Sequence, residues 1–177
     1  KIDKKTLTIR KKKWKLYEED ISVKMDAGFS LFLRPKCEYS RKRFLYRKAE
    51  VYDLDFLVNR LNINAEIILD VGANIGYWSS YLAMYKKNII SFEPDPTTYK
   101  ILEKNLLPFQ TYSKLENLAV GNLKGNVDFY LNPIHSGDNS PIKGSENWDK
   151  ISVPSCDLDS YLVSQKINDV GLIKIDV

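Results

Sequence analysis

The amino-acid sequence predicts an α/β fold in which helices cover both faces of a parallel β-sheet. From residue 66 to residue 120, segments with the pattern of buried strands alternate with segments that have the pattern of helices. These strand segments are apolar on both faces, which is typical of a parallel sheet between two layers of helices. A glycine turn follows the first of these strands, and such a turn before a helix is a frequent site for nucleoside ligands.

The first 48 residues predict a small antiparallel β meander with one face exposed to water. In this part apolar residues alternate with polar ones at period two. The apolar positions are Leu7, Ile9, Trp14, Leu16, Ile21, Val23, Met25, Phe29, Leu31 and Leu33. Over residues 49–61 the apolar spacing changes to three and four, which predicts a helix with one apolar face.

The remaining elements are predicted in order along the chain. Strands are expected at residues 66–71, 88–93 and about 115–120, with helices at 76–85 and 97–107 between them. Then follow a strand at 125–131, a polar loop at 132–149, a strand at 151–153, a helix at about 157–165 and a last strand at 171–177. We therefore expect a basic N-terminal meander, residues 1–48, packed on a core domain formed by residues 49–177.

Composition is that of one globular domain. The chain has 177 residues, 44% of them apolar and 12% aromatic, and no apolar run approaches the ~18–20 residues that cross a bilayer. Because the sequence shows no signal-peptide pattern, we expect a cytoplasmic protein that does not associate with a membrane. The two cysteines, Cys37 and Cys156, lack metal-site or redox spacing, so we expect free thiols and no metal site.

The charge is unevenly distributed along the chain. Residues 1–48 contain 16 Lys and Arg against 6 Asp and Glu, whereas residues 49–177 contain 11 against 17. One basic cluster surrounds Trp14 and could dock RNA or another polyanion, or could simply be a solvated surface: Arg10, Lys11, Lys12, Lys13 and Lys15. A second cluster could bind an anionic substrate such as a nucleotide sugar: Arg41, Lys42, Arg43, Arg47 and Lys48.

The glycine turn at residues 70–76 is the strongest functional signal. A dinucleotide site needs a glycine where Asn74 stands, and a phosphate-binding loop needs a Gly-Lys-Ser/Thr ending, which is absent. Together with Glu93 at the end of the next strand, the turn instead predicts an S-adenosylmethionine pocket. Turn amides would receive the cofactor's carboxylate, and Glu93 would accept hydrogen bonds from the ribose hydroxyls. The alternative is a plain strand-to-helix turn with Glu93 in solvent.

Five blocks in a fixed order resemble the FkbM-type class I methyltransferases, at residues 69–77, 91–95, 117–121, 157–162 and 173–177. The resemblance implies a Rossmann-like fold, S-adenosylmethionine as methyl donor, and transfer to a hydroxyl of a saccharide or other small metabolite. It places Gly72, Asn74 and Gly76 on the methionine side, Glu93 at the ribose, and Ala119 with Val120 at the adenine. The full set of cofactor residues expected from turn and resemblance is Asp70, Gly72, Ala73, Asn74, Gly76, Tyr77, Glu93, Pro94, Asp95, Ala119 and Val120.

Two residues are candidates for acid-base chemistry at the acceptor. By the resemblance, Asp176 at the carboxyl end of the last strand lies beside the methyl group, as a base or as a group that orients the acceptor. His135, the only histidine, lies in the polar loop 132–149 and could cover the acceptor. The alternatives are a simple strand-end carboxylate and an exposed loop histidine. Asp157 and Asp159 are expected to cap the following helix.

The resemblance also has a limit at the end of the chain. In the family the last block runs on into an acidic residue, a glycine and further strands, so this sequence supplies about four of the usual seven core strands. We expect strand 171–177 to have an unpaired apolar edge that pairs with a second copy, or the chain to be part of a longer polypeptide. Other functions considered are RNA or protein methylation with the basic part as docking surface, and a non-catalytic binding module.

Overall fold

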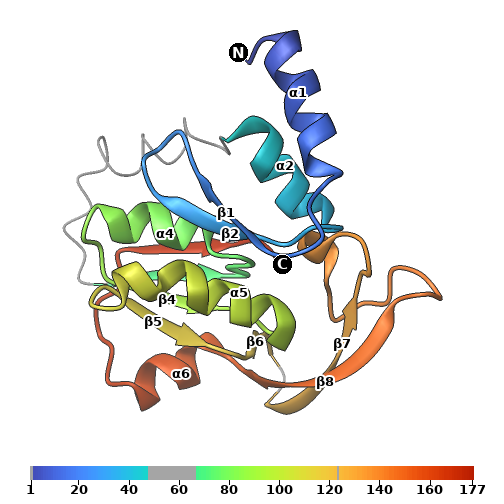
Figure 1. The fold of residues 1–177 in the computed structure, drawn as a ribbon. Coiled ribbons are helices and arrows are strands. Elements are labelled where there is room, and N and C mark those ends of the chain that lie inside the picture. The colour runs from blue at the N-terminus through green and yellow to red at the C-terminus, as the bar shows by residue number, and fades with distance from the viewer. Residues whose placement is uncertain (1, 48–66, 123) are drawn as a thin grey trace.

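The computed structural model describes residues 2–47, 67–122 and 124–177 and has an α/β architecture (Figure 1). Its centre is a parallel sheet of four strands in the order β5-β4-β3-β9. The strands are β3 (Ile68–Val71), β4 (Ile89–Phe92), β5 (Ser113–Glu116) and β9 (Leu172–Ile175). This sheet confirms the predicted Rossmann-like fold.

The inner strands β3 and β4 are buried on both faces because helices cover each side of the sheet (Figure 1). The helices are α4 (Tyr77–Met84), α5 (Pro96–Leu106) and α6 (Leu158–Ser164). Ile68 and Ile89 belong to the apolar cluster that contains α4 side chains. Leu69 and Ile90, one residue further along each strand, belong to the cluster that contains Tyr161 of α6. Successive residues of these strands are apolar because alternate side chains pack into two separate cores, one on each face of the sheet.

A second sheet of three strands forms an arm beside the carboxyl ends of the central strands (Figure 1). It contains β6 (Ala119–Val120), β7 (Gly125–Leu131) and β8 (Asp149–Cys156) in the order β6-β8-β7. The strand predicted at 115–120 is divided between β5 and β6, because the chain leaves the central sheet and pairs with β8. The strand predicted at 151–153 is longer, since β8 pairs with the whole of β7. Between β7 and β8 the predicted loop contains one short 3₁₀ turn, η2 (Ser136–Asp138).

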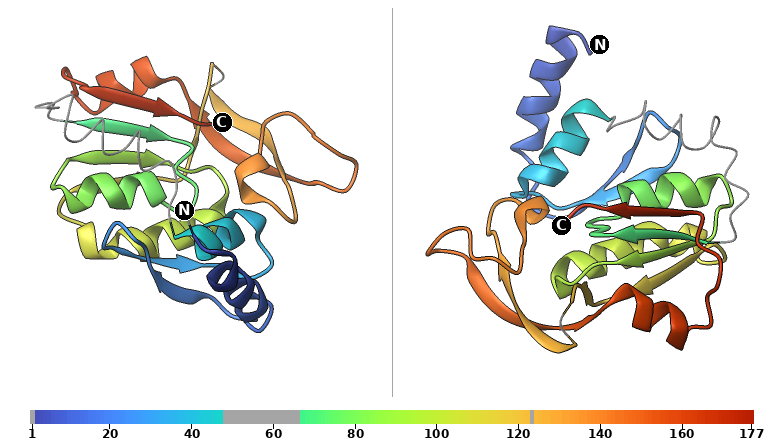
Figure 2. Two further views of the ribbon diagram at one scale, coloured as in Figure 1. Left: turned by 90° about the horizontal axis from the view of Figure 1, so that it is seen from above. Right: turned by 180° about the vertical axis from the view of Figure 1, so that it is seen from behind.

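The expected meander over residues 1–48 is only partly correct. Two strands, β1 (Ile21–Lys24) and β2 (Ser30–Leu33), form an antiparallel hairpin as predicted. Two helices flank this hairpin, α1 (Lys4–Trp14) and α2 (Glu38–Tyr46). The strand expected around Leu7 and Ile9 is therefore wrong, and α1 projects away from the central sheet (Figure 2).

The helix α1 forms because its start is capped and its residues favour helix. Asp3 accepts a hydrogen bond from the N–H of Thr6 at 2.9 Å, which satisfies one of the free donors of the first turn. Leu7 and Trp14, seven residues or two turns apart, pack into the core with α2. Ile9 is 46% exposed, so this apolar position of the period-two pattern is not a buried position in the structure.

Two expectations concern residues outside the described part of the chain, and the expectation for the cysteines is met. The helix predicted at 49–61 and the boundary between residues 48 and 49 lie outside the part that the structure describes. Cys37 and Cys156 are free thiols, as expected. None of the described helices is both long and apolar enough to cross a bilayer.

Strand β9 has one paired and one open edge. It pairs in parallel with β3, and no other strand among the described residues pairs with it. Ile173 is 44% exposed and Ile175 is 62% exposed. The expected pairing of strand 171–177 with a second copy stays a prediction that this exposure motivates.

Candidate cofactor and methyl-transfer site

The turn between β3 and α4 adopts the sharp backbone conformation that its glycines predicted. Gly72 and Gly76 have positive φ angles of 74° and 81°, a conformation that L-residues adopt only with strain. A Cβ atom on Gly72 would lie 2.0 Å from the backbone oxygen of Asp176, and one on Gly76 would lie 2.5 Å from Leu102 Cδ1. The glycines therefore let the end of β9 and helix α5 approach the turn, which is a structural reason in addition to any contact with ligand.

The N–H groups of residues 72–76 all have acceptors within the protein. Two of them donate to the carbonyl oxygen of Phe92 at 3.0 and 2.9 Å. The N–H of Asn74 donates to Glu93 Oε2 at 2.8 Å, and the last two donate within the turn. The expectation that these turn amides receive a cofactor carboxylate is therefore not supported, because their donor capacity is already used.

Glu93 follows β4 and is 5% exposed. Its Oε1 accepts a hydrogen bond from the N–H of Asp95 at 2.9 Å, and its Oε2 accepts the one from Asn74. Burial raises the pKa of the Glu93 carboxyl to about 8, although these two backbone hydrogen bonds act in the opposite direction. Each carboxylate oxygen keeps a second lone pair, and Glu93 lines the pocket described next.

A pocket of about 460 Å³ lies at the carboxyl ends of the central strands. This volume is in the range of small-molecule sites, and the position is where open α/β sheets bind their ligands. Eight of the residues expected from the sequence line it together: Gly72, Asn74, Glu93, Pro94, Ala119, Val120, His135 and Asp176. The structure thus brings both expected catalytic residues and six of the expected cofactor residues to one place.

The other five expected residues do not line the pocket: Asp70, Ala73, Gly76, Tyr77 and Asp95. Asp95 caps α5 by accepting from the N–H of Thr97 at 2.9 Å. Tyr77 is fully buried against Phe29, and Ala73 packs in the core. These residues therefore stabilise the turn and the neighbouring helices on the side away from the pocket.

Asp70 is a buried ion-pair partner. Only 1% of its side chain is exposed, and its Oδ1 lies 2.9 Å from Nζ of Lys174. Lys174 also donates to the carbonyl oxygen of Gly72 at 2.9 Å and lies 3.8 Å from Asp176 Oδ2. One ammonium group therefore ties the turn to β9. The sequence analysis missed Lys174, although a cation inside an apolar strand was a readable signal.

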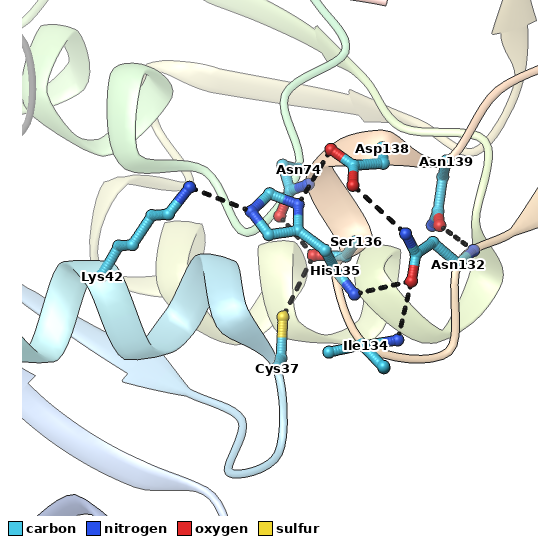
Figure 3. A network of polar contacts seen from close by, with 9 residues as sticks. All are labelled: Cys37, Lys42, Asn74, Asn132, Ile134, His135, Ser136, Asp138 and Asn139. Carbon is cyan, nitrogen blue, oxygen red and sulfur yellow. Dashed lines mark hydrogen bonds and ion pairs between the residues drawn. The ribbon is translucent and has the colours of Figure 1, made fainter. Parts of the chain in front are cut away.

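The loop between β7 and β8 reaches the glycine turn through side chains (Figure 3). Ser136 Oγ donates to Asn74 Oδ1 at 3.2 Å and lies 3.4 Å from Cys37 Sγ. His135 Nδ1 lies 3.2 Å from Asp138 Oδ1, and its Nε2 lies 3.5 Å from Lys42 Nζ. The loop is thus joined to both α2 and the turn, and it carries His135 to the pocket wall, as the sequence suggested.

Helix α2 supplies a wall of the pocket that the sequence analysis only partly foresaw. Tyr39, Lys42 and Arg43 line the pocket. Arg41 pairs with Glu38 instead, at 2.7 Å. The second predicted basic cluster therefore divides, because successive residues of a helix point to different sides. Its last member, Lys48, lies outside the described residues.

Asp176 is exposed at the end of the pocket. Its side chain is 78% exposed, and Nζ of Lys174 lies 3.8 Å from its Oδ2. An exposed carboxylate at this position can accept a hydrogen bond from a hydroxyl that enters from solvent. Among the described residues no group of three or more His, Cys, Asp or Glu side chains could hold a metal ion.

A parallel sheet in this order, with a glycine turn and a strand-end acid beside one pocket, defines the class as Rossmann-like α/β proteins with a ligand site at the carboxyl ends of the strands. The family described as Methyltransferase FkbM domain matches residues 70–177. The chain therefore belongs to the FkbM methyltransferase family, whose cofactor is S-adenosylmethionine. No curated protein matches the sequence significantly.

Solved structures that are similar to this chain match only part of it. A Pyrococcus abyssi tRNA (uracil-54, C5)-methyltransferase in complex with S-adenosyl-L-homocysteine is 19% identical over 55% of this chain and 23% of its own, with a TM-score of 0.39. A Pyrococcus horikoshii protein provisionally described as a transferase is 21% identical over 58% of this chain and 37% of its own, with a TM-score of 0.44. The match therefore spans only 23% and 37% of the length of these proteins, and their substrates are not carried over to this chain.

Proposed function

We propose that this chain is an S-adenosylmethionine-dependent O-methyltransferase that acts on a hydroxyl of a saccharide-like or other small metabolite. The observation that carries the proposal is a single pocket that contains the Glu93 carboxylate at the end of β4 and Asp176 after β9. One acid is buried and the other is exposed. This difference suits one carboxylate that holds the cofactor and one that meets an acceptor from solvent.

The residues of the pocket fit the parts of the proposed cofactor. Glu93 would accept from the ribose hydroxyls, while Ala119 and Val120 offer an apolar edge for the adenine. Gly72 and Asn74 lie beside the methionine part. We retain the division into residues 1–48 and 49–177 as a proposal, in which the first part adds the α2 wall to the pocket.

The chemistry requires loss of a proton from the acceptor hydroxyl. When bound, S-adenosylmethionine would supply an electrophilic methyl group on a sulfonium sulfur, and the break of that carbon–sulfur bond would leave S-adenosylhomocysteine. Asp176 would orient the acceptor hydroxyl and take its proton as the new carbon–oxygen bond forms, an assistance typically worth ~10²–10⁴ in rate. His135 would hold the acceptor from the opposite loop.

A saccharide-like acceptor is supported by the polar character of the loop wall. His135, Ser136, Asn139 and Ser140 all line the pocket, and they can donate and accept hydrogen bonds to several hydroxyls. None of the described residues of α1 lines the pocket. The RNA or protein alternative therefore stays a prediction for the α1 surface, separate from the pocket.

Calorimetry with S-adenosylhomocysteine tests the cofactor proposal, and a folded protein that binds none of it would contradict the proposal. For the acceptor, labelled cofactor is incubated with cell extract and the label is traced to glycan, small-metabolite, lipid, RNA or protein fractions. We expect label in the first two. Asp176→Asn should lower the transfer rate ~10²-fold or more without changing binding of S-adenosylhomocysteine, and Asp128→Asn on the arm is the matched control.

A further inference from the structure

Arg43 is held in the pocket wall by two aromatic rings. Its guanidinium carbon lies 4.5 Å from the ring centre of Tyr39 and 5.0 Å from that of Tyr77. Nη2 donates to the hydroxyl of Tyr39 at 2.9 Å. Such stacking restricts the rotamers of a long side chain and keeps the planar group in one orientation.

Arg43 differs from Arg41 of the same helix in that no carboxylate among the described residues pairs with it. Arg41 forms an ion pair with Glu38, and Arg47 donates to the carbonyl oxygens of Phe44 and Lys24. Within the described residues Arg43 pairs with no acid, and its buried Nε has no acceptor. A guanidinium group has five N–H donors, and Tyr39 is the acceptor that the described part of the chain offers to Arg43.

The glycine turn offers no free amide donor to the one anionic group of the proposed cofactor. The amides of the turn, residues 72–76, are all occupied within the protein. Tyr77, which contacts Arg43, is the residue that directly follows this turn. A cation with free donors therefore lies next to the turn beside which the methionine part of the cofactor is proposed to lie.

We propose that Arg43 holds the carboxylate of the methionine part of S-adenosylmethionine. A planar guanidinium can bind a carboxylate through two parallel hydrogen bonds, which fixes both the position and the orientation of that end of the ligand. Lys42, which lines the pocket beside His135, adds a second positive charge at the rim. This assignment rests on the proposed function and replaces the turn amides as the carboxylate site.

The test compares S-adenosylmethionine with its decarboxylated analogue, which keeps the ammonium group and lacks the carboxylate. Calorimetry measures both dissociation constants for the wild-type chain, Arg43→Gln and Arg41→Gln. Arg41→Gln removes the same charge from the same helix but outside the pocket. We expect the wild type and Arg41→Gln to bind S-adenosylmethionine at least ~10-fold more tightly than the analogue, and Arg43→Gln to lose this preference.

The outcomes separate this inference from the proposed function. Failure of the wild type to bind either compound contradicts the proposed function and the inference with it. Binding with an unchanged preference in Arg43→Gln overturns the inference alone and leaves the site as a cofactor pocket. Equal weakening of both compounds by Arg43→Gln also overturns it, because a purely structural role would not depend on the carboxylate. Arg43→Lys keeps the charge and most of the packing, so it should retain part of the preference, and loss of all of it would contradict charge recognition.

Discussion

Replacing Gly72 by alanine tests the link between the glycine turn and the end of β9. The new Cβ would lie 2.0 Å from the backbone oxygen of Asp176 and 3.2 Å from a side-chain carbon of Val177. An ordinary contact begins near 3.4 Å, so the two backbone segments must separate by about 1.4 Å, the difference between these distances. No side-chain rotation can relieve the contact, because the atom that is met belongs to the backbone.

The magnitude follows from two separate costs. A residue with a side chain at a φ of 74° costs ~1–2 kcal/mol, and overpacking of a closed contact costs ~1–3 kcal/mol more. We therefore expect Gly72→Ala to lower the free energy of unfolding by ~2–5 kcal/mol. A displacement of more than 1 Å at the pocket should also weaken binding of S-adenosylhomocysteine, because Asp176 and the turn both line it.

The matched control is Gly125→Ala. Gly125 also has a positive φ, of 97°, but nothing lies within 4 Å of its Cβ position. It should lose only ~1–2 kcal/mol and keep its affinity for the ligand. Urea denaturation and calorimetry measure both quantities. Equal loss of stability in the two variants, with normal binding by Gly72→Ala, would refute the close-approach argument.

Three further predictions follow from contacts around the site. Lys174→Met leaves the buried carboxylate of Asp70 without its ammonium at 2.9 Å and should cost ~3–5 kcal/mol of unfolding free energy in urea. The exposed pair of Lys150 on the arm gives the control, since Lys150→Met should cost at most ~1 kcal/mol; similar losses would contradict the role of burial. The folded-state pKa of Glu93, about 8, lies above its ordinary value of 4.5, so its contribution to stability is complete below pH ~4.5 and is lost as pH rises to ~8. Denaturation of Glu93→Gln should show a flatter pH profile than the wild type over this interval, and identical profiles would count against a buried, proton-binding Glu93. Ile175→Lys should reduce any concentration-dependent rise in light-scattering mass, whereas a wild type that is monomeric at high concentration would contradict self-association through β9.

Sequence reasoning succeeded where one residue pattern had one structural solution. The apolar runs around Ile68 and Ile89 became parallel strands, and the glycine turn adopted positive φ angles at Gly72 and Gly76. The first 48 residues were harder, because a charged helix with few buried positions also shows apolar residues two apart. In the structure Asp3 caps helix α1, and the sequence analysis, which followed the alternation at Leu7 and Ile9, did not consider this cap.

The pocket shows the same division between local and long-range information. Glu93 and Asp176 were placed correctly at it, since the carboxyl ends of parallel strands share one edge of the sheet. The occupation of the turn amides could not be read from the sequence, because three of the five donate to Phe92 and Glu93, at the end of a different strand. Neither could the position of Arg43, which depends on how α2 packs against Tyr77.

By itself, the sequence determined the class of fold, the family and the two acids of the pocket, because these depend on periodicity and on short blocks whose spacing is fixed within the chain. Only the tertiary structure decided which polar groups remain free to meet a ligand. Hydrogen-bond satisfaction is settled between segments far apart in sequence: the turn amides are occupied by β4 and the turn itself, Asp70 is occupied by Lys174 of β9, and Arg43 of α2 keeps donors without a partner among the described residues.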